Sequence, residues 1–252
     1  MMPLIRQIRP LRWLTIAALA LLAGCMDTGT VPTSNTPNQT PASKPAMAAV
    51  AAPSPNAAKA RQFLAVVKTV EPVAEAECRA RAPRANCDFR IVVDDRPGPV
   101  ANAFQTLDNA GRPIIAFTLP MIAEVRNADE LAFVMGHETA HHIQGHLSRQ
   151  RENAQSSAII FAGIAALTGG DASTVRSASR WGAEFGARSY SKDFELEADA
   201  LGTVITQRAG YDPIRGAAFF TRIPDPGNRF LGTHPPNAQR IETVRRVAAR
   251  GL

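Results

Sequence analysis

Several patterns that would point to particular functional classes are missing from this chain of 252 residues. No run of basic residues is interleaved with aromatic residues, although the formal net charge is +6, so we expect no nucleic-acid partner. Cysteine is scarce, with three residues, and the separation of Cys78 from Cys87 excludes a metal site of the CxxC type. The chemistry of this chain therefore has to come from residues other than cysteines and basic clusters.

The apolar run near the N-terminus, residues 13–23, is too short to span a bilayer comfortably. It follows a segment with three arginines and no acidic residue, which is the form of a secretory signal. The run closes on Leu22-Ala23-Gly24-Cys25, which resembles a bacterial lipobox. We therefore expect residues 1–24 to be a lipoprotein signal peptide, and Cys25 to carry lipid that anchors the protein without spanning the membrane. The alternative is an ordinary cleaved signal followed by an unrelated cysteine.

These features predict a bacterial envelope protein on the periplasmic side of a membrane. By resemblance to enterobacterial lipoproteins, Met26 in place of an aspartate favours the outer membrane. An oxidising compartment would let Cys78 and Cys87 form a disulfide, and the alternative is a pair of buried thiols. Residues 25–57 are rich in Pro, Thr, Ser, Asn and Ala, so we expect a disordered tether followed by one domain over residues 58–252.

All five histidines lie in two places, four of them between positions 137 and 146 and the fifth at His234. The first segment begins His137-Glu138-Thr139-Ala140-His141. On a helix, His137 and His141 stand one turn apart on the same face, so both rings can reach one zinc ion while Glu138 points toward the attacking water. The sequence therefore predicts a zinc hydrolase.

The other two histidines of this segment are poor candidates for a third ligand. His146 lies off the ligand face if the helix continues, which favours a structural or supporting role, and His142 points the other way. A metzincin would have a glycine and a third histidine at the positions that Gln144 and Leu147 occupy here, so that class is excluded. The third ligand has to come from elsewhere in the chain.

A better third ligand lies downstream, in an acidic segment with helical character. Glu195 and Asp199 are four residues apart, so Glu195 can bind the metal while Asp199 supports a ligand from behind. Glu197 lies on the other side of this helix and is the less suitable ligand. Two histidines and a glutamate are a common ligand set for catalytic zinc. The alternative is a solvated acidic helix face.

Together these motifs resemble a known family of zinc metalloendopeptidases, the one that includes the HtpX heat-shock proteases and the CAAX prenyl proteases. The resemblance covers about residues 58–247 and is closest to small periplasmic or lipoprotein members, which are gluzincins involved in outer-membrane protein quality control. The matching segments are His137-Glu138-x-x-His141, Glu195-x-x-Ala198-Asp199, Ala209-Gly210-Tyr211-Asp212-Pro213, Thr233-His234-Pro235-Pro236 and Arg240-Ile241.

The resemblance implies zinc ligands at His137, His141 and Glu195, a general base at Glu138, and support of a ligand histidine by Asp199. It also implies a lipid-anchored zinc endopeptidase that hydrolyses peptide bonds of misfolded or stalled envelope proteins. The alternative is a zinc-stabilised periplasmic chaperone or outer-membrane assembly adaptor with little proteolysis.

Three roles remain open for His234, the histidine outside the main cluster. It can donate to the oxyanion of the reaction, bind zinc as a blocking fourth ligand, or simply begin a helix ahead of Pro235 and Pro236. The second role is the one suggested by resemblance to the periplasmic assembly proteases.

The coarse pattern predicts an α+β fold, a mainly helical zincin-type domain with a small β-sheet beside the active-site helix. Helical spacing covers residues 58–82 with an interruption near Pro72, and a second helix opens near Asp129 and carries the histidine motif. Residues 89–93, 102–104 and 113–119 read as strands. The last of these strands contains the segment Ile114, Ile115, Ala116 and Phe117. This segment is either an edge strand that pairs with an extended substrate or an ordinary sheet strand.

Residues 156–167 are apolar nearly all round, yet they are too few for a membrane span. With residues 172–191 they predict a helical hairpin packed beside or over the active site. Core packing is the favoured role of the apolar helix. If exposed, it could bind unfolded outer-membrane polypeptide or touch lipid.

Overall fold

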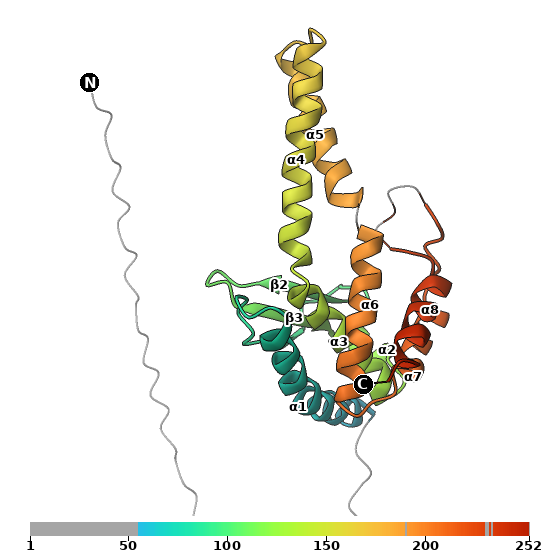
Figure 1. The fold of residues 1–252 in the computed structure, drawn as a ribbon. Coiled ribbons are helices and arrows are strands. Elements are labelled where there is room, and N and C mark those ends of the chain that lie inside the picture. The colour runs from blue at the N-terminus through green and yellow to red at the C-terminus, as the bar shows by residue number, and fades with distance from the viewer. Residues whose placement is uncertain (1–54, 190, 230–231, 233, 252) are drawn as a thin grey trace, which may run out of the picture. The chain divides into compact units, whose positions relative to one another are not determined.

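The computed structural model describes residues 55–189, 191–229, 232 and 234–251. The predicted signal peptide, Cys25 and most of the predicted tether lie outside these residues. The described part is mostly helical and contains a three-stranded sheet, so the predicted α+β class is confirmed (Figure 1).

The first helix, α1, covers Pro55–Arg81 and continues through Pro72. An interruption was predicted there because proline removes a backbone donor from the helix. Val70 and Ala74, on either side of the proline, are both fully buried, and this packing offsets the lost hydrogen bond. Near the end of α1, Cys78 forms a disulfide with Cys87, with Cα atoms 5.6 Å apart, and so ties the helix to the segment before the sheet.

The sheet consists of β1 (Arg90–Asp94), β2 (Ala103–Leu107) and β3 (Pro113–Thr118) in the order β1-β3-β2. β3 pairs with β1 in parallel and with β2 antiparallel, so both of its sides are occupied. The prediction that Ile114–Phe117 forms a substrate-binding edge is therefore wrong. Its side chains are mostly buried and it lies between two strands, whereas β2 forms an edge of the described sheet.

A short helix, α2 (Leu119–Glu124), leads into α3 (Ala128–Ile143), which carries the histidine motif. Asn127 caps α3 by accepting a hydrogen bond from the backbone N–H of Glu130. α3 packs against α6 (Ser191–Arg208), and the two helices touch backbone to backbone at Gly136 and Gly202. A Cβ atom on Gly202 would lie 2.9 Å from the backbone nitrogen of His137, so this crossing leaves no room for a side chain.

Between α3 and α6, the helices α4 (His146–Leu167) and α5 (Ala172–Ser189) form a hairpin that projects from the rest of the domain (Figure 1). They approach closely: a Cβ atom on Gly186 would lie 2.2 Å from the carbonyl oxygen of Asn153. The favoured prediction of core packing for residues 156–167 is wrong, because the outward face of α4 is exposed. The large exposed apolar residues of α4 are Ile159, Ile160, Phe161, Ile164 and Leu167. Among the described residues, no helix has the length and apolar character needed to cross a membrane.

The C-terminal part comprises α7 (Pro213–Ala217), the 3-10 turn η1 (Ala218–Thr221) and α8 (Asn237–Ala248). Glu130, in the first turn of α3, is buried and accepts two hydrogen bonds of 2.7 Å from the Arg222 guanidinium. α8 packs against α6, so the end of the domain is placed next to the helix that carries Glu195 (Figure 1).

Candidate active site

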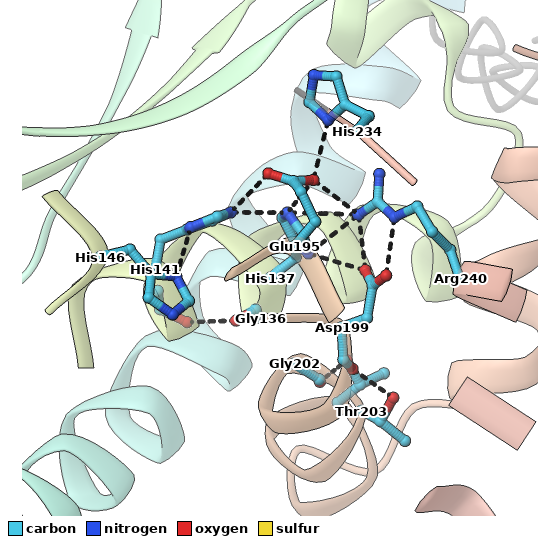
Figure 2. A network of polar contacts seen from close by, with 12 residues as sticks. Gly136, His137, His141, His146, Glu195, Asp199, Gly202, Thr203, His234 and Arg240 are labelled. Carbon is cyan, nitrogen blue, oxygen red and sulfur yellow. Dashed lines mark hydrogen bonds and ion pairs between the residues drawn. The ribbon is translucent and has the colours of Figure 1, made fainter. Parts of the chain in front are cut away.

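Three side chains from two helices converge at one point of the domain. His137 and His141 come from α3 and Glu195 comes from α6, and one ligand atom of each lies within 4.8 Å of the others (Figure 2). The two Nε2 atoms are 3.0 Å apart, and the Glu195 oxygens lie 3.6 Å from His137 Nε2 and 3.4 Å from His141 Nε2. Donor atoms around a tetrahedral zinc, at the usual bond lengths, are separated by about 3.3 Å. The donor set and its spacing therefore fit zinc.

His137 is held from behind by a carboxylate. Its Nδ1 lies 3.0 Å from Oδ1 of Asp199, which is fully buried on α6, and this contact leaves Nε2 facing Glu195. Arg240 on α8 reaches the same carboxylate with Nη2 at 2.6 Å from Oδ1 and Nε at 2.8 Å from Oδ2 (Figure 2). The guanidinium also stacks over the ring of Phe220 at 3.9 Å. The sequence predicts the position of Asp199 behind a ligand but gives no indication of a role for Arg240.

His141 has a different partner on its far side. Its Nδ1 lies 2.8 Å from Nδ1 of His146, at the start of α4, and Nε2 of His146 lies 3.1 Å from Oε2 of Glu197. Neither His146 nor Glu197 belongs to the three-residue cluster. His142 points away and donates from Nε2 to the carbonyl oxygen of Asn86 at 2.8 Å.

The carboxylates of the site are stabilised in their charged form. Burial alone would raise the pKa of Glu195, but hydrogen bonds from His141 and His234 and nearby positive charge lower it well below its ordinary value. The pKa of Asp199 is lowered in the same way, because the Arg240 charge outweighs burial. Both carboxylates are therefore charged at neutral pH, and Glu195 can act as an anionic ligand.

The histidines behave differently from one another. Burial lowers the pKa of His141, but its hydrogen bond to Glu195 and the charge of Glu138 outweigh that effect, and the pKa is raised. Burial lowers the pKa of His146 to about 4, against the opposing hydrogen bond to Glu197. His146 is therefore neutral at physiological pH.

The cluster opens into a cavity of about 710 Å³. Glu138 is half-buried in the wall of this cavity, beside the candidate zinc ligands. His234 also lines it: its side chain is 55% exposed, and Nδ1 lies 3.1 Å from Oε2 of Glu195 (Figure 2). The neighbouring Thr233 lies outside the described residues. One wall of the cavity is made by the edge strand β2 and the segment before it, from Val100 to Gln105.

Comparison with known proteins places this site in a family. Residues 60–248 match Peptidase family M48, which is most of the chain. The chain belongs to peptidase family M48. The resemblance to HtpX-type zinc metalloendopeptidases predicted from the sequence is thereby confirmed, and members of this family use zinc.

Three similar proteins come from enterobacteria and a vibrio. The beta-barrel assembly-enhancing protease of Escherichia coli (strain K12) is 32% identical and that of Yersinia pestis 31%, each over 48% of this chain and 28% of the relative. The putative beta-barrel assembly-enhancing protease of Vibrio cholerae serotype O1 is 32% identical over 48% of this chain and 26% of the relative. The match thus spans less than a third of the length of these relatives.

Proposed function

We propose that this protein is a zinc-dependent endopeptidase that hydrolyses peptide bonds of misfolded or stalled envelope proteins. One observation carries the proposal: the ligand atoms of His137, His141 and Glu195 lie within 4.8 Å of one another, in a cavity that Glu138 also lines. Family membership supports the peptidase activity. The names of the similar proteins, which refer to assembly of β-barrels, support an envelope substrate.

The chemistry follows from the positions of these side chains. Zinc, bound by the two histidines and the glutamate, would polarise the scissile carbonyl and acidify the attacking water. Glu138 takes a proton from that water on its carboxylate and returns it to the nitrogen of the leaving amine. His234, at the cavity wall beside Glu195, donates a ring N–H to the oxyanion that develops on the scissile carbonyl.

The edge strand β2 offers a binding surface for an extended polypeptide. Within the described sheet β2 is paired only with β3, and its residues Ala103, Phe104 and Gln105 line the same cavity as Glu138. A peptide added beside β2 gains backbone hydrogen bonds that do not depend on its side chains. Such recognition suits unfolded substrates of varied sequence, and it assigns to β2 the role that was predicted for Ile114–Phe117.

We also propose export and a lipid anchor at Cys25, with residues 25–57 as a tether between the outer membrane and the peptidase domain. The signal-like segment over residues 1–24 and its Leu-Ala-Gly-Cys ending support this placement. The disulfide between Cys78 and Cys87 suits an oxidising compartment such as the periplasm.

Replacing Glu138 with glutamine tests the peptidase proposal. The substitution removes the base but leaves the metal ligands and the fold in place, so Glu138→Gln should bind one zinc per chain and lose cleavage of an unfolded outer-membrane protein. Unchanged envelope function in cells that carry Glu138→Gln would instead favour the chaperone or adaptor role.

A second substitution tests the role of His234. If His234 stabilises the oxyanion, His234→Ala should lower kcat about 10²-fold to 10³-fold, as loss of one oxyanion donor does elsewhere. A higher rate in His234→Ala would mean that this residue blocks the metal, and an unchanged rate would leave it the role of a helix-start residue.

A further inference from the structure

Four polar side chains form a chain of hydrogen bonds, and the last of them is the candidate zinc ligand His141. Arg149 donates to Glu197 with Nη1 at 2.6 Å from Oε2, and the same oxygen lies 3.1 Å from Nε2 of His146. The other ring nitrogen of His146, Nδ1, lies 2.8 Å from Nδ1 of His141. These contacts join α4 and α6 to α3, and the contact of His146 with His141 lies on the side of the cluster away from Asp199 (Figure 2).

The direction of each hydrogen bond in this chain is fixed by chemistry. The Glu197 carboxylate only accepts, so Nε2 of His146 carries a hydrogen, and in the tautomer with this single N–H, Nδ1 of the ring is an acceptor. Nδ1 of His141 must then be the donor in the 2.8 Å contact. When His141 is in the neutral form that can bind a metal, its lone pair is consequently on Nε2, which is the nitrogen that faces Glu195 and His137.

Packing holds the His146 ring in this orientation. The side chain is only 4% exposed and stacks on Phe194 with ring centroids 4.6 Å apart and an interplanar angle of 10°. The guanidinium of Arg149 lies 4.3 Å from the centroid of the same Phe194 ring. Both His146 and Arg149 belong to the first turns of α4, directly after the left-handed residue Gly145 that separates α3 from α4.

We infer that His146, oriented by Glu197, is a positioning residue that fixes the tautomer and the direction of the zinc ligand His141. This inference rests on the proposed zinc site. It makes the two ligand histidines unequal: His137 is backed directly by a buried carboxylate, Asp199, whereas His141 is backed by the imidazole of His146, with the Glu197 carboxylate one step further away. Partners of this kind commonly alter metal affinity 10-fold to 100-fold when they are removed.

Two substitutions at one position separate hydrogen bonding from packing. In His146→Asn, the amide oxygen occupies nearly the place of Nδ1 and keeps an acceptor for His141, whereas His146→Leu has similar bulk and no acceptor. The zinc dissociation constant of the purified protein, measured by competition with a chromophoric chelator, should rise about 10-fold to 100-fold in His146→Leu and stay close to the natural value in His146→Asn. His142→Ala is the matched control, because His142 lies next to His141 on α3 but contacts Asn86 instead of His146.

Thermal unfolding of the metal-free forms shows whether each variant still folds. Equal zinc affinity in His146→Leu and His146→Asn would overturn the inference and leave His146 a packing residue. The proposed peptidase function fails separately, if the natural protein binds zinc but cleaves no unfolded polypeptide. In that case the comparison of zinc affinities still tests the role of His146.

Discussion

One oxygen of Asp199, Oδ1, contacts both His137 and Arg240, while Oδ2 accepts a second hydrogen bond from Arg240. The distance from Oδ1 is 3.0 Å to Nδ1 of His137 and 2.6 Å to Nη2 of Arg240. Because these residues lie on α6, α3 and α8, one buried carboxylate joins three helices directly behind the candidate metal site. The orientation of a ligand on α3 therefore depends on the docking of the last helix of the described chain.

Removal of this carboxylate should damage both the fold and the metal site. Asp199→Ala leaves the buried Arg240 with only the longer contact to Glu195, at 3.4 Å, and we expect a loss of about 3 kcal/mol in the free energy of unfolding. Zinc affinity should fall about 10-fold to 100-fold, because His137 loses its orienting acceptor. Urea unfolding of the metal-free protein and chelator competition measure the two effects. A metal-free Asp199→Ala protein as stable as the natural one would contradict this account.

The crossing of α3 and α6 should not tolerate a methyl group. Gly202→Ala places a Cβ atom 2.9 Å from the backbone nitrogen of His137, so the helices must move apart at a cost of about 1–3 kcal/mol. We expect weaker zinc binding as well, because Glu195 moves with α6. Gly163→Ala is the control: no atom lies within 4 Å of its added Cβ on α4, and it should stabilise the protein by about 0.5–1 kcal/mol.

Removal of zinc should abolish cleavage without unfolding the domain. The hydrophobic core, which includes Phe89, Phe117 and Leu131, does not depend on the ligand cluster for its packing. Circular dichroism of the chelated protein should therefore retain its helical signal. Zinc in large excess should raise the unfolding free energy by about 4 kcal/mol at a thousand times its dissociation constant. Loss of the helical signal on chelation would show that the metal is required for folding.

Binding along β2 predicts sensitivity to the substrate backbone. Methylation of one peptide nitrogen that would pair with β2 removes a hydrogen bond worth about 0.5–1.5 kcal/mol, so kcat/KM should fall roughly 2-fold to 10-fold. Methylation of the next nitrogen along, which points away from the sheet, should change kcat/KM much less. If kcat/KM depends on the side chains of the substrate but does not change when its backbone is methylated, strand addition is contradicted.

The sequence predicted the parts of the site that depend on helical periodicity. The i, i+4 spacing of His137 and His141, and of Glu195 and Asp199, follows from 3.6 residues per turn and needs no knowledge of the tertiary structure. Arg240 was missed because its role arises only when α8 docks on α6, 41 residues away along the chain. No local pattern distinguishes an arginine that will be buried against an aspartate from one on a solvated helix.

Strand order and helix exposure were likewise beyond local patterns. β2 precedes β3 in the chain but lies at the edge, because β3 pairs with both β1 and β2, so the buried character of Ile115 and Phe117 reflects a central strand. The apolar sequence of α4 suggested a core helix. Its inner face packs on α5, and Leu167 on the outer face remains 90% exposed, so apolar composition alone did not decide its place.

The contact between Gly136 and Gly202 gives the metal site an all-or-none character. The spacing of the two ligand-bearing helices is set by contact between main-chain atoms. A side chain at this contact could change its rotamer and so allow a small displacement of the helices, but main-chain atoms cannot. Docking of α6 on α3 and assembly of the zinc ligands are therefore the same event. The capacity of this protein to bind metal should report directly on whether these two helices are docked, and a partly unfolded chain should hold no half-formed site.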